Sequence, residues 1–168
     1  MIRNSYNFFT SVLRSRPQAV AFLRGSAEFP DISGIVRFYA TEWGTLVAAD
    51  VVGLPHKNGE CEGRIFGFHI HAGESCTGNA DDPFADALSQ YDTNLCPHPY
   101  HAGDMPPLFG CRGRAFSVFL TDRVTVGELI GKTVIIHDSP DDFMTQPSGN
   151  AGTKIACGVI SPTARHRW

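Results

Sequence analysis

Histidines and aspartates are the residues of this 168-residue chain best suited to chemistry, and seven histidines are present. Two of them, His69 and His71, are separated by one residue in the segment Gly-Phe-His-Ile-His. Residues at positions i and i+2 of a β-strand point to the same face, so the segment predicts two imidazoles side by side. Such a pair can chelate Cu, Zn, Fe or Ni. The alternative is a pair of exposed strand histidines without a ligand.

A second group of metal-binding side chains lies between Cys96 and Asp104. The imidazoles of His98 and His101 and the carboxylate of Asp104 fall on a segment that Pro97 and Pro99 stiffen. Two nitrogen donors and one carboxylate oxygen suit Zn²⁺. In such a site we expect Gly103 to give the backbone the freedom that Asp104 needs to reach an ion. The alternative is a polar, proline-rich loop that binds no metal.

A third group begins at His137, the last residue of an apolar segment that we predict to be a strand. Asp141 and Asp142 follow it. A single histidine at a strand end is usually structural, so the case for His137 as a ligand depends on the other two groups.

The elements that must position these groups are mostly strands. Short apolar segments alternate with Gly and Pro turns, which favours a β-sandwich or barrel. Five of the seven histidines and most of the aspartates lie in or beside two long loops, 72–112 and 138–153, and loops of this length are usually functional. A short helix or turn is expected at Thr125–Ile130. The predicted strands are Gln18–Arg24, Ile32–Ala40, Gly44–Gly53, Arg64–His71, Arg114–Thr121, Thr133–His137 and Lys154–Ile160.

Composition limits the classes of protein that fit. With 42% hydrophobic and 18% charged residues, the chain has the composition of a folded domain. The net charge of −3 argues against a nucleic-acid binder, and no apolar run is long enough to span a bilayer. We expect one domain at 18–161, an N-terminal extension at 1–17 that forms one helical turn or is disordered, and a tail at 162–168.

The chain resembles the copper/zinc superoxide dismutases over roughly residues 18–161. Gly-Phe-His-Ile-His at 67–71 and Gly-Asn-Ala-Gly-x-x-x-Ala-Cys-Gly-Val-Ile at 149–160 carry this resemblance, together with the His-x-x-His-x-Gly-Asp segment and the strand-end histidine. The resemblance implies an all-β fold, an eight-stranded Greek-key β-barrel or sandwich with two long functional loops. It also implies superoxide as the substrate, copper and zinc as cofactors, and allows a homodimer.

The resemblance assigns roles to individual residues. It implies that copper is held by His69, His71 and His137, and that zinc is held by His98, His101 and Asp104. Asp141 matches a carboxylate that hydrogen-bonds histidines of both sites.

The resemblance also implies a disulfide between Cys76 and Cys157, against the alternative of two reduced thiols. The resemblance assigns no disulfide partner to Cys61, Cys96 or Cys111, and a Cys96–Cys111 pair stays open. The absence of a signal peptide predicts a cytoplasmic protein, whereas the implied disulfide favours an oxidising compartment, so both locations stay open.

Three features depart from the family pattern. Gln90 occupies the position of the histidine that binds both metals, and a glutamine amide is a weak neutral ligand that cannot form an imidazolate. Lys154 replaces an arginine that guides superoxide, so the positive charge is kept without the rigid guanidinium fork. Only two residues separate His98 from His101, fewer than is usual in the family.

Two functions follow from these observations. The first is a superoxide dismutase in which His69, His71, His137 and Lys154 are the catalytic residues. The second is a weak or inactive member of the family that binds zinc, copper or both for structure or metal buffering, and the substitution at Gln90 favours it. A β-sandwich whose histidines bind nothing is the third alternative. No nucleic-acid or membrane partner is expected.

Overall fold

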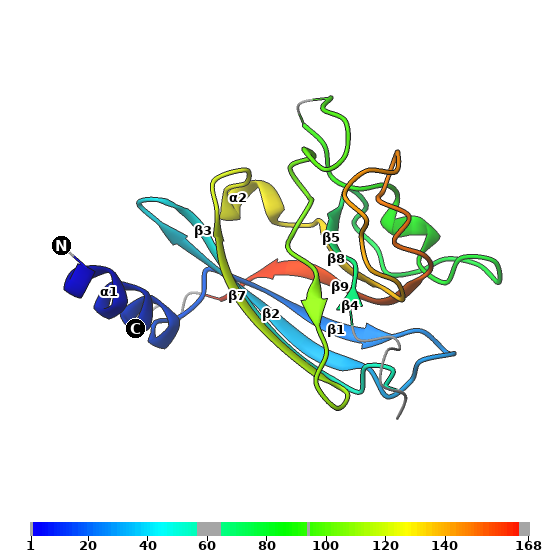
Figure 1. The fold of residues 1–168 in the computed structure, drawn as a ribbon, viewed down its shortest axis with the longest axis horizontal. Helices are drawn as coiled ribbons and strands as arrows, with labels where there is room; N and C mark the ends of the chain where they lie inside the picture. Colours follow the sequence, from blue (N-terminus) through cyan, green and yellow to red (C-terminus); the bar gives the residue numbers. More distant parts are fainter. Residues whose placement is uncertain (1, 57–64, 94, 165–168) are drawn as a thin grey trace.

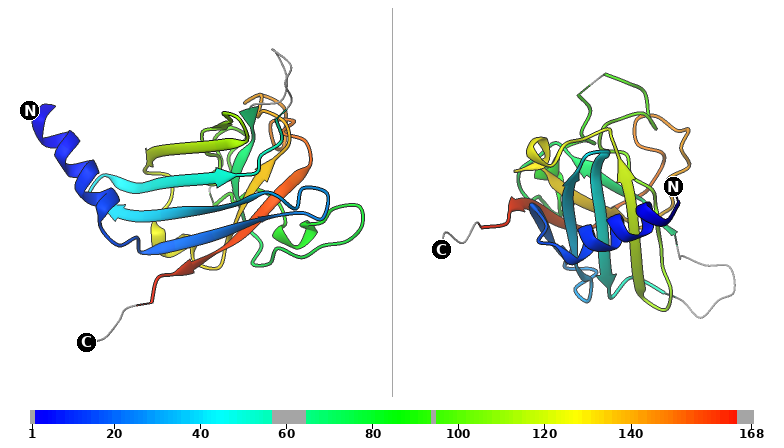
Figure 2. Two further views of the ribbon diagram at one scale, coloured as in Figure 1. Left: turned by 90° about the horizontal axis from the view of Figure 1, so that it is seen from below. Right: turned by 90° about the vertical axis from the view of Figure 1, so that its left-hand side faces the viewer.

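The fold is a curled, antiparallel β-sheet that forms a half-barrel (Figures 1 and 2). It is seen in a computed structural model that describes residues 2–56, 65–93 and 95–164. The main sheet has seven strands in the order β5-β8-β9-β1-β2-β3-β7. Their bounds are β1 Ala19–Gly25, β2 Ser33–Thr41, β3 Gly44–Val52, β5 Phe68–His71, β7 Arg114–Thr121, β8 Thr133–His137 and β9 Lys154–Pro162.

The predicted all-β fold is confirmed, although the strand count differs from the expected eight. The described residues form the seven-stranded sheet and a small second sheet that pairs β4 (Ile65–Phe66) with β6 (Leu108–Phe109). The segment that we predicted as one strand, Arg64–His71, is divided at Gly67, and Arg64 lies outside the described residues. The sequence did not indicate β6, because two residues are too few to show an alternating pattern.

The break at Gly67 places the start of β5 against the end of β8. The Gly67 amide donates to Ser139 O at 2.8 Å, and the His137 amide donates to Gly67 O at 2.8 Å. A Cβ at this position would lie 2.8 Å from the Cβ of Ala151, so glycine allows the close approach. The result is that β5 and β8 present their histidines beside one another.

The core lies inside the curl of the sheet. Its largest fully buried side chains include Phe38, Phe66, Phe68, Ile70 and Ile136. Both faces of β3 are apolar because each packs against a different partner. One face belongs to this main core, whereas Leu46 and Ala48 on the other face form a small cluster with Tyr39.

A helix covers that outer cluster. Helix α1 spans Ile2–Arg14, which is longer than the single helical turn expected and is not the disordered tail given as the alternative. Phe9 and Val12 pack against the cluster, and the ring of Phe8 lies 4.6 Å from that of Trp43. Apolar contacts with the sheet stabilise a helix whose sequence alone gives a weak signal.

The remaining elements are short. Helix α2, Val126–Leu129, lies inside the predicted Thr125–Ile130 segment and begins at a capping box formed by Thr125 and Glu128. A single 3-10 turn, η1, spans Ala85–Ala87. Strand β9 reaches Pro162, so the predicted tail starts later than expected. No helix among the described residues is long and apolar enough to cross a membrane.

The two long loops meet at one end of the sheet. The segment after β8 and the segment after β5 lie side by side there (Figure 1). The Gln146 side chain joins them, because it accepts from the His98 amide at 3.0 Å and donates to His98 O at 2.8 Å. This contact brings the three groups of histidines and aspartates together.

Candidate metal centre

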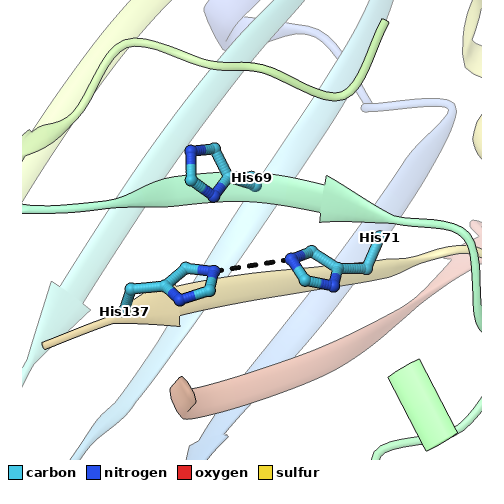
Figure 3. Close-up of side chains that lie close together, drawn as sticks. All are labelled: His69, His71 and His137. Atoms are coloured by element: carbon cyan, nitrogen blue, oxygen red, sulfur yellow. Dashed lines mark hydrogen bonds between the residues drawn. The ribbon is translucent and has the colours of Figure 1, made fainter. Parts of the chain in front are cut away.

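The first cluster consists of three histidines from two paired strands. His69 and His71 project from β5, and His137 is the last residue of β8 (Figure 3). One nitrogen from each ring lies within 4.8 Å of the other two, and the Nε2 atoms of His71 and His137 are 3.4 Å apart. All three side chains are buried. The sequence prediction that these imidazoles lie together is confirmed, and the exposed-histidine alternative is wrong.

Backbone carbonyls fix the direction of two of these rings. Nδ1 of His71 lies 2.7 Å from Leu88 O, and Nδ1 of His137 lies 3.2 Å from Gly152 O. A ring whose Nδ1–H donates to a carbonyl keeps a lone pair on Nε2. Both lone pairs are therefore directed into the space between the rings, as a metal site requires.

Burial keeps the same two rings neutral. It lowers the pKa of His71 to about 3 and that of His137 to about 4. Positive charge on neighbouring groups, including Lys154, contributes to both of these shifts. A neutral imidazole is the form that binds a metal ion.

The second cluster is formed by the segment that we predicted as a zinc site. Nδ1 of His98 lies 3.1 Å from Oδ1 of Asp104, and Nδ1 of His101 lies 3.5 Å from Oδ2 of the same carboxylate. The His101 amide also donates to that carboxylate at 2.9 Å. The short spacing between His98 and His101 therefore does not prevent the three side chains from converging.

Gly103 has a different role from the one that we expected. Its backbone lies between β5 and Tyr91, where Ile70 N donates to Gly103 O and Gly103 N donates to Tyr91 O, at 2.8 and 2.7 Å. A Cβ would lie 2.3 Å from Ile70 O. The glycine is needed for this close packing, and the packing holds the second cluster next to the first.

Asp141 joins the two clusters. Its Oδ2 lies 2.7 Å from Nε2 of His69, and its Oδ1 lies 2.9 Å from Nε2 of His98. Burial alone would raise the pKa of the Asp141 carboxyl, but hydrogen bonds from His69, the Phe143 amide and His98 lower it to about 2. The carboxylate is thus ionised and orients one ring of each cluster.

Gly149 makes room for this link. It has a positive φ of 67°, and a Cβ there would lie 2.0 Å from Oδ1 of Asp141 and 2.7 Å from Nε2 of His98. The sequence showed Gly149 only as part of a motif, and its role was missed. The carbonyls of Leu88 and Gly152 were missed as well, because any residue supplies a backbone carbonyl.

Gln90 lies between the two clusters. Its terminal amide is 2.8 Å from Nδ1 of His101. In the orientation that satisfies both polar atoms of the amide, the oxygen accepts from Nδ1 of His69 at 2.9 Å, and the nitrogen donates to Pro147 O at 3.2 Å. This is the place that the resemblance gives to a bridging histidine.

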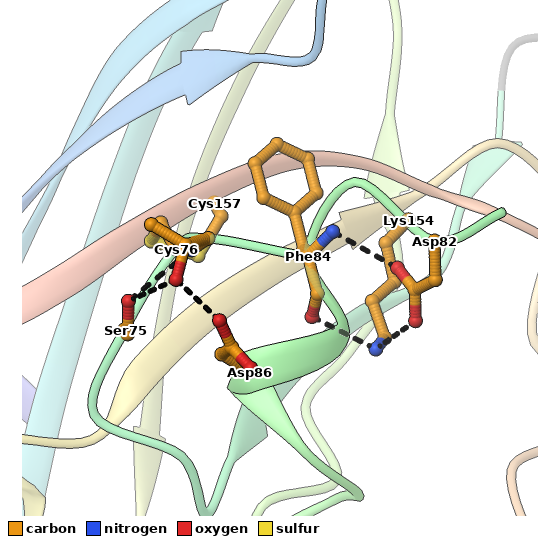
Figure 4. Close-up of a disulfide and its surroundings, with 8 residues drawn as sticks. Ser75, Cys76, Asp82, Phe84, Asp86, Lys154 and Cys157 are labelled. Atoms are coloured by element: carbon orange, nitrogen blue, oxygen red, sulfur yellow. Dashed lines mark hydrogen bonds and ion pairs between the residues drawn. A yellow bond between two sulfur atoms is a disulfide. The ribbon is translucent and has the colours of Figure 1, made fainter. Parts of the chain in front are cut away.

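A pocket of about 510 Å³ opens beside the first cluster, and its walls include His71, His137, Gln90 and Lys154. Lys154, the first residue of β9, donates to Oδ2 of Asp82 at 2.7 Å and to Phe84 O at 3.1 Å (Figure 4). The structure therefore places the predicted cation at the pocket but pairs it with a carboxylate that the sequence analysis did not single out.

Cys76 and Cys157 form a disulfide, as the resemblance implied (Figure 4). It is the one disulfide among the described cysteines, so Cys96 and Cys111 are not joined to each other. Cys61 lies outside the described residues.

The donor chemistry of the two clusters fits the two expected metals. Three imidazoles suit copper, and two imidazoles with a carboxylate suit zinc. The ring nitrogens that do not face the other donors are held by Leu88 O, Gly152 O and Asp141, an arrangement typical of metal-binding histidines.

Comparison with known proteins gives concordant results. Residues 32–160 match the sequence model of the copper/zinc superoxide dismutase family. The protein "Superoxide dismutase [Cu-Zn]" of Legionella pneumophila is 33% identical over 136 residues, which cover 78% of this chain and 79% of that protein. The "Superoxide dismutase-like protein YojM" of Bacillus subtilis is 32% identical over 111 residues, 58% of this chain and 56% of that protein. The solved Cu/Zn superoxide dismutase from Brucella abortus superimposes with a TM-score of 0.69 at 22% identity, and the match covers 84% of this chain and 98% of that one.

Proposed function

Since this chain belongs to the copper/zinc superoxide dismutase family, we propose that it is a superoxide dismutase that carries copper in the first cluster and zinc in the second. The copper ligands are His69, His71 and His137, and the zinc ligands are His98, His101 and Asp104. The observation that carries the proposal is the link through Asp141, which orients one histidine of each three-donor cluster.

The chain's own residues supply the setting for the reaction. When bound, copper supplies one-electron redox chemistry, by which one superoxide is oxidised to O₂ and a second, with two protons, is reduced to H₂O₂. His71 and His137 lie at the wall of the pocket, so a small anion that enters it comes directly to the first cluster. Lys154, at the wall of the same pocket, supplies positive charge that attracts the anion, and its ion pair with Asp82 offsets part of that charge.

Proton supply is the step that the substitution at Gln90 affects most. An amide neither takes up nor releases a proton near neutral pH. The pocket then has to supply both protons of H₂O₂ from groups other than the side chain between the clusters. This requirement favours a slower reaction than a bridging imidazole would allow.

The same residue favours the second candidate function, a weak or inactive family member that binds metal. The Gln90 amide accepts from Nδ1 of His69 and donates to Nδ1 of His101, so the described residue that lies between the clusters is an amide and not an imidazole that binds two metals at once. Zinc in the second cluster with little copper in the first is the composition that this candidate predicts.

Elemental analysis together with a superoxide-consumption assay separates the two candidates. The metal-free protein is loaded with both ions, dialysed, analysed and assayed with and without copper. Copper and zinc near one each, with copper-dependent consumption, supports the dismutase. Zinc alone without superoxide consumption supports the second candidate. A protein that binds neither copper nor zinc contradicts both candidates. The His71→Ala protein should lose the copper. His56 lies outside both clusters, so His56→Ala is the matched control and should retain the copper.

A further inference from the structure

The Lys154 ammonium at the pocket wall is already paired with a carboxylate. Its Nζ donates to Oδ2 of Asp82 at 2.7 Å and to Phe84 O at 3.1 Å (Figure 4). The Lys154 side chain is only 15% exposed, whereas that of Asp82 is 39% exposed. The cation is therefore held on the wall, and its charge is offset at the point where an incoming anion would meet it.

Asp82 is itself held in place by its loop. Its Oδ1 accepts from the Phe84 amide at 2.9 Å, and its own amide donates to Oδ1 of Asn79 at 3.0 Å. The disulfide from Cys76 to Cys157 ties the same loop to β9, three residues after Lys154. The ion pair thus joins two elements that are already fixed to each other.

Asp82 stays ionised in this setting. Burial alone would raise the pKa of its carboxyl, but the hydrogen bonds from Lys154 and from the Phe84 amide lower that pKa below its usual value. At neutral pH the pair therefore consists of a full negative and a full positive charge.

The rest of the pocket adds more negative charge. Among the described residues that line it, Lys154 is the one lysine or arginine, whereas Asp81, Asp82 and Asp92 are acidic. The whole chain also carries a formal charge of −3. A pocket in which carboxylates outnumber cations repels a small anion unless the Lys154 ammonium is released from its ion pair with Asp82.

We propose that Asp82 is a positioning residue that sets the specificity of this pocket, because its ion pair with Lys154 suppresses the entry of anions such as superoxide. The proposal rests on the proposed function only in taking superoxide as the substrate. The suppression of anion binding itself belongs to the pocket and is present without a metal.

Asp82→Asn tests this proposal, since the amide keeps an oxygen for the Phe84 N–H and removes the charge. The first readout is binding of inorganic phosphate to the metal-free protein, followed through the backbone amide NMR signals of the residues that line the pocket. We expect the dissociation constant to fall about threefold or more relative to the unchanged protein. Asp81→Asn makes the same change of charge at an exposed neighbour without an ion pair to Lys154, and should have a smaller effect.

A double-mutant cycle shows whether the effect passes through Lys154. In a Lys154→Met background, Asp82→Asn should improve phosphate binding no more than Asp81→Asn does. An equal gain in both backgrounds, or equal gains for the two aspartates, would overturn the proposal in favour of a general charge effect. Unchanged phosphate binding in a folded Asp82→Asn protein, with folding checked by thermal unfolding, would overturn it as well.

The second readout is the rate constant for superoxide consumption by the copper- and zinc-loaded protein. Asp82→Asn should raise it about threefold or more at an ionic strength of about 10 mM, and the gain should shrink at about 200 mM because salt screens the charges. If phosphate binding improves while no protein consumes superoxide, the proposed dismutase activity fails and the role of Asp82 stands. If superoxide is consumed but neither phosphate binding nor the rate changes, the role of Asp82 fails alone.

Discussion

The side-chain amide of Gln90 lies 2.8 Å from Nδ1 of His101, with its other polar atom 2.9 Å from Nδ1 of His69. One neutral side chain therefore hydrogen-bonds a nitrogen in each cluster of the metal-free protein. A metal ion that uses either nitrogen must displace one of these bonds. Gln90 thus keeps the site assembled without metal and competes weakly with metal at the same time.

Replacing Gln90 with histidine should restore a side chain that can bind metal on both sides. An imidazole has two nitrogens and can take up and release a proton, and a well-placed acid or base commonly accelerates a reaction by about 10²-fold or more. We expect Gln90→His to raise the rate of superoxide consumption about tenfold or more in protein loaded with both metals. The assay is run beside elemental analysis of the same sample.

Gln90→Leu is the matched control, since it removes the amide hydrogen bonds without adding a ligand. It should not raise the rate. If Gln90→His binds both metals and consumes superoxide no faster than the unchanged protein, the limit to turnover lies elsewhere, and the ion pair of Lys154 with Asp82 is the next place to look.

Asp141→Asn should weaken metal binding at both clusters together. The carboxylate accepts hydrogen bonds from His69, His98 and the Phe143 amide, whereas an asparagine turns an NH₂ group toward one of these donors. Loss of such an orienting partner typically lowers metal affinity about 10- to 100-fold. Competition with a chelator, measured separately for copper and zinc, checks the prediction.

Asp142→Asn is the control for that experiment, because the Asp142 side chain is exposed and, among the contacts described, bonds only to Met144 and Thr145 of its own turn. It should leave both affinities within about twofold, as surface changes usually do. A loss at one cluster alone in Asp141→Asn would mean that the carboxylate does not couple the two.

The ligand-type residues could be predicted because their chemistry is local. His69 and His71 lie on one face for reasons of strand geometry, and the His98–Asp104 segment brings its donors together within one loop. The meeting of the clusters at Asp141 came from the resemblance alone, since nothing in the residue pattern shows that two loops far apart in sequence touch.

Other features could not be predicted because they depend on tertiary contacts. The ion pair of Asp82 with Lys154 joins residues 72 positions apart in the sequence. Nothing in the sequence around an aspartate in a polar loop indicates which residue it pairs with. The length of α1 depends on contacts of Phe9 and Val12 with the sheet, and the sequence shows no sign of that surface. Gly149 is needed only because Asp141 lies against it.

The stability of the metal-free protein should fall as the pH decreases from about 6.5 to 4. The pKa values of His71 and His137 are lowered from 6.5 to about 3 and about 4 in the folded protein, chiefly by burial. Between these values the unfolded chain binds protons that the folded chain does not, so acid favours unfolding. Each histidine contributes roughly 1 kcal/mol per pH unit in this window.

Urea unfolding of the metal-free protein at several pH values measures this dependence. His137→Gln removes one of the two titrating groups, so its free energy of unfolding should depend less steeply on pH. Asp141, whose pKa is lowered to about 2, adds a further loss of stability only below its ordinary value of 3.8. A free energy of unfolding that is constant from pH 7 to 4 would contradict the assignment of neutral, buried rings.

The disulfide between Cys76 and Cys157 should stabilise the fold and the first cluster together. It closes a loop of 81 residues in sequence, which corresponds to about 4 kcal/mol in the chain-entropy model. The same loop carries Leu88, whose carbonyl lies 2.7 Å from Nδ1 of His71. We therefore expect Cys76→Ser to lower the free energy of unfolding by about 2–4 kcal/mol and to weaken copper binding more than zinc binding. Cys111→Ser changes an exposed thiol and is the control for both measurements. Equal losses of copper and zinc affinity would show that the bridge supports the whole end of the sheet and not the Leu88 segment in particular.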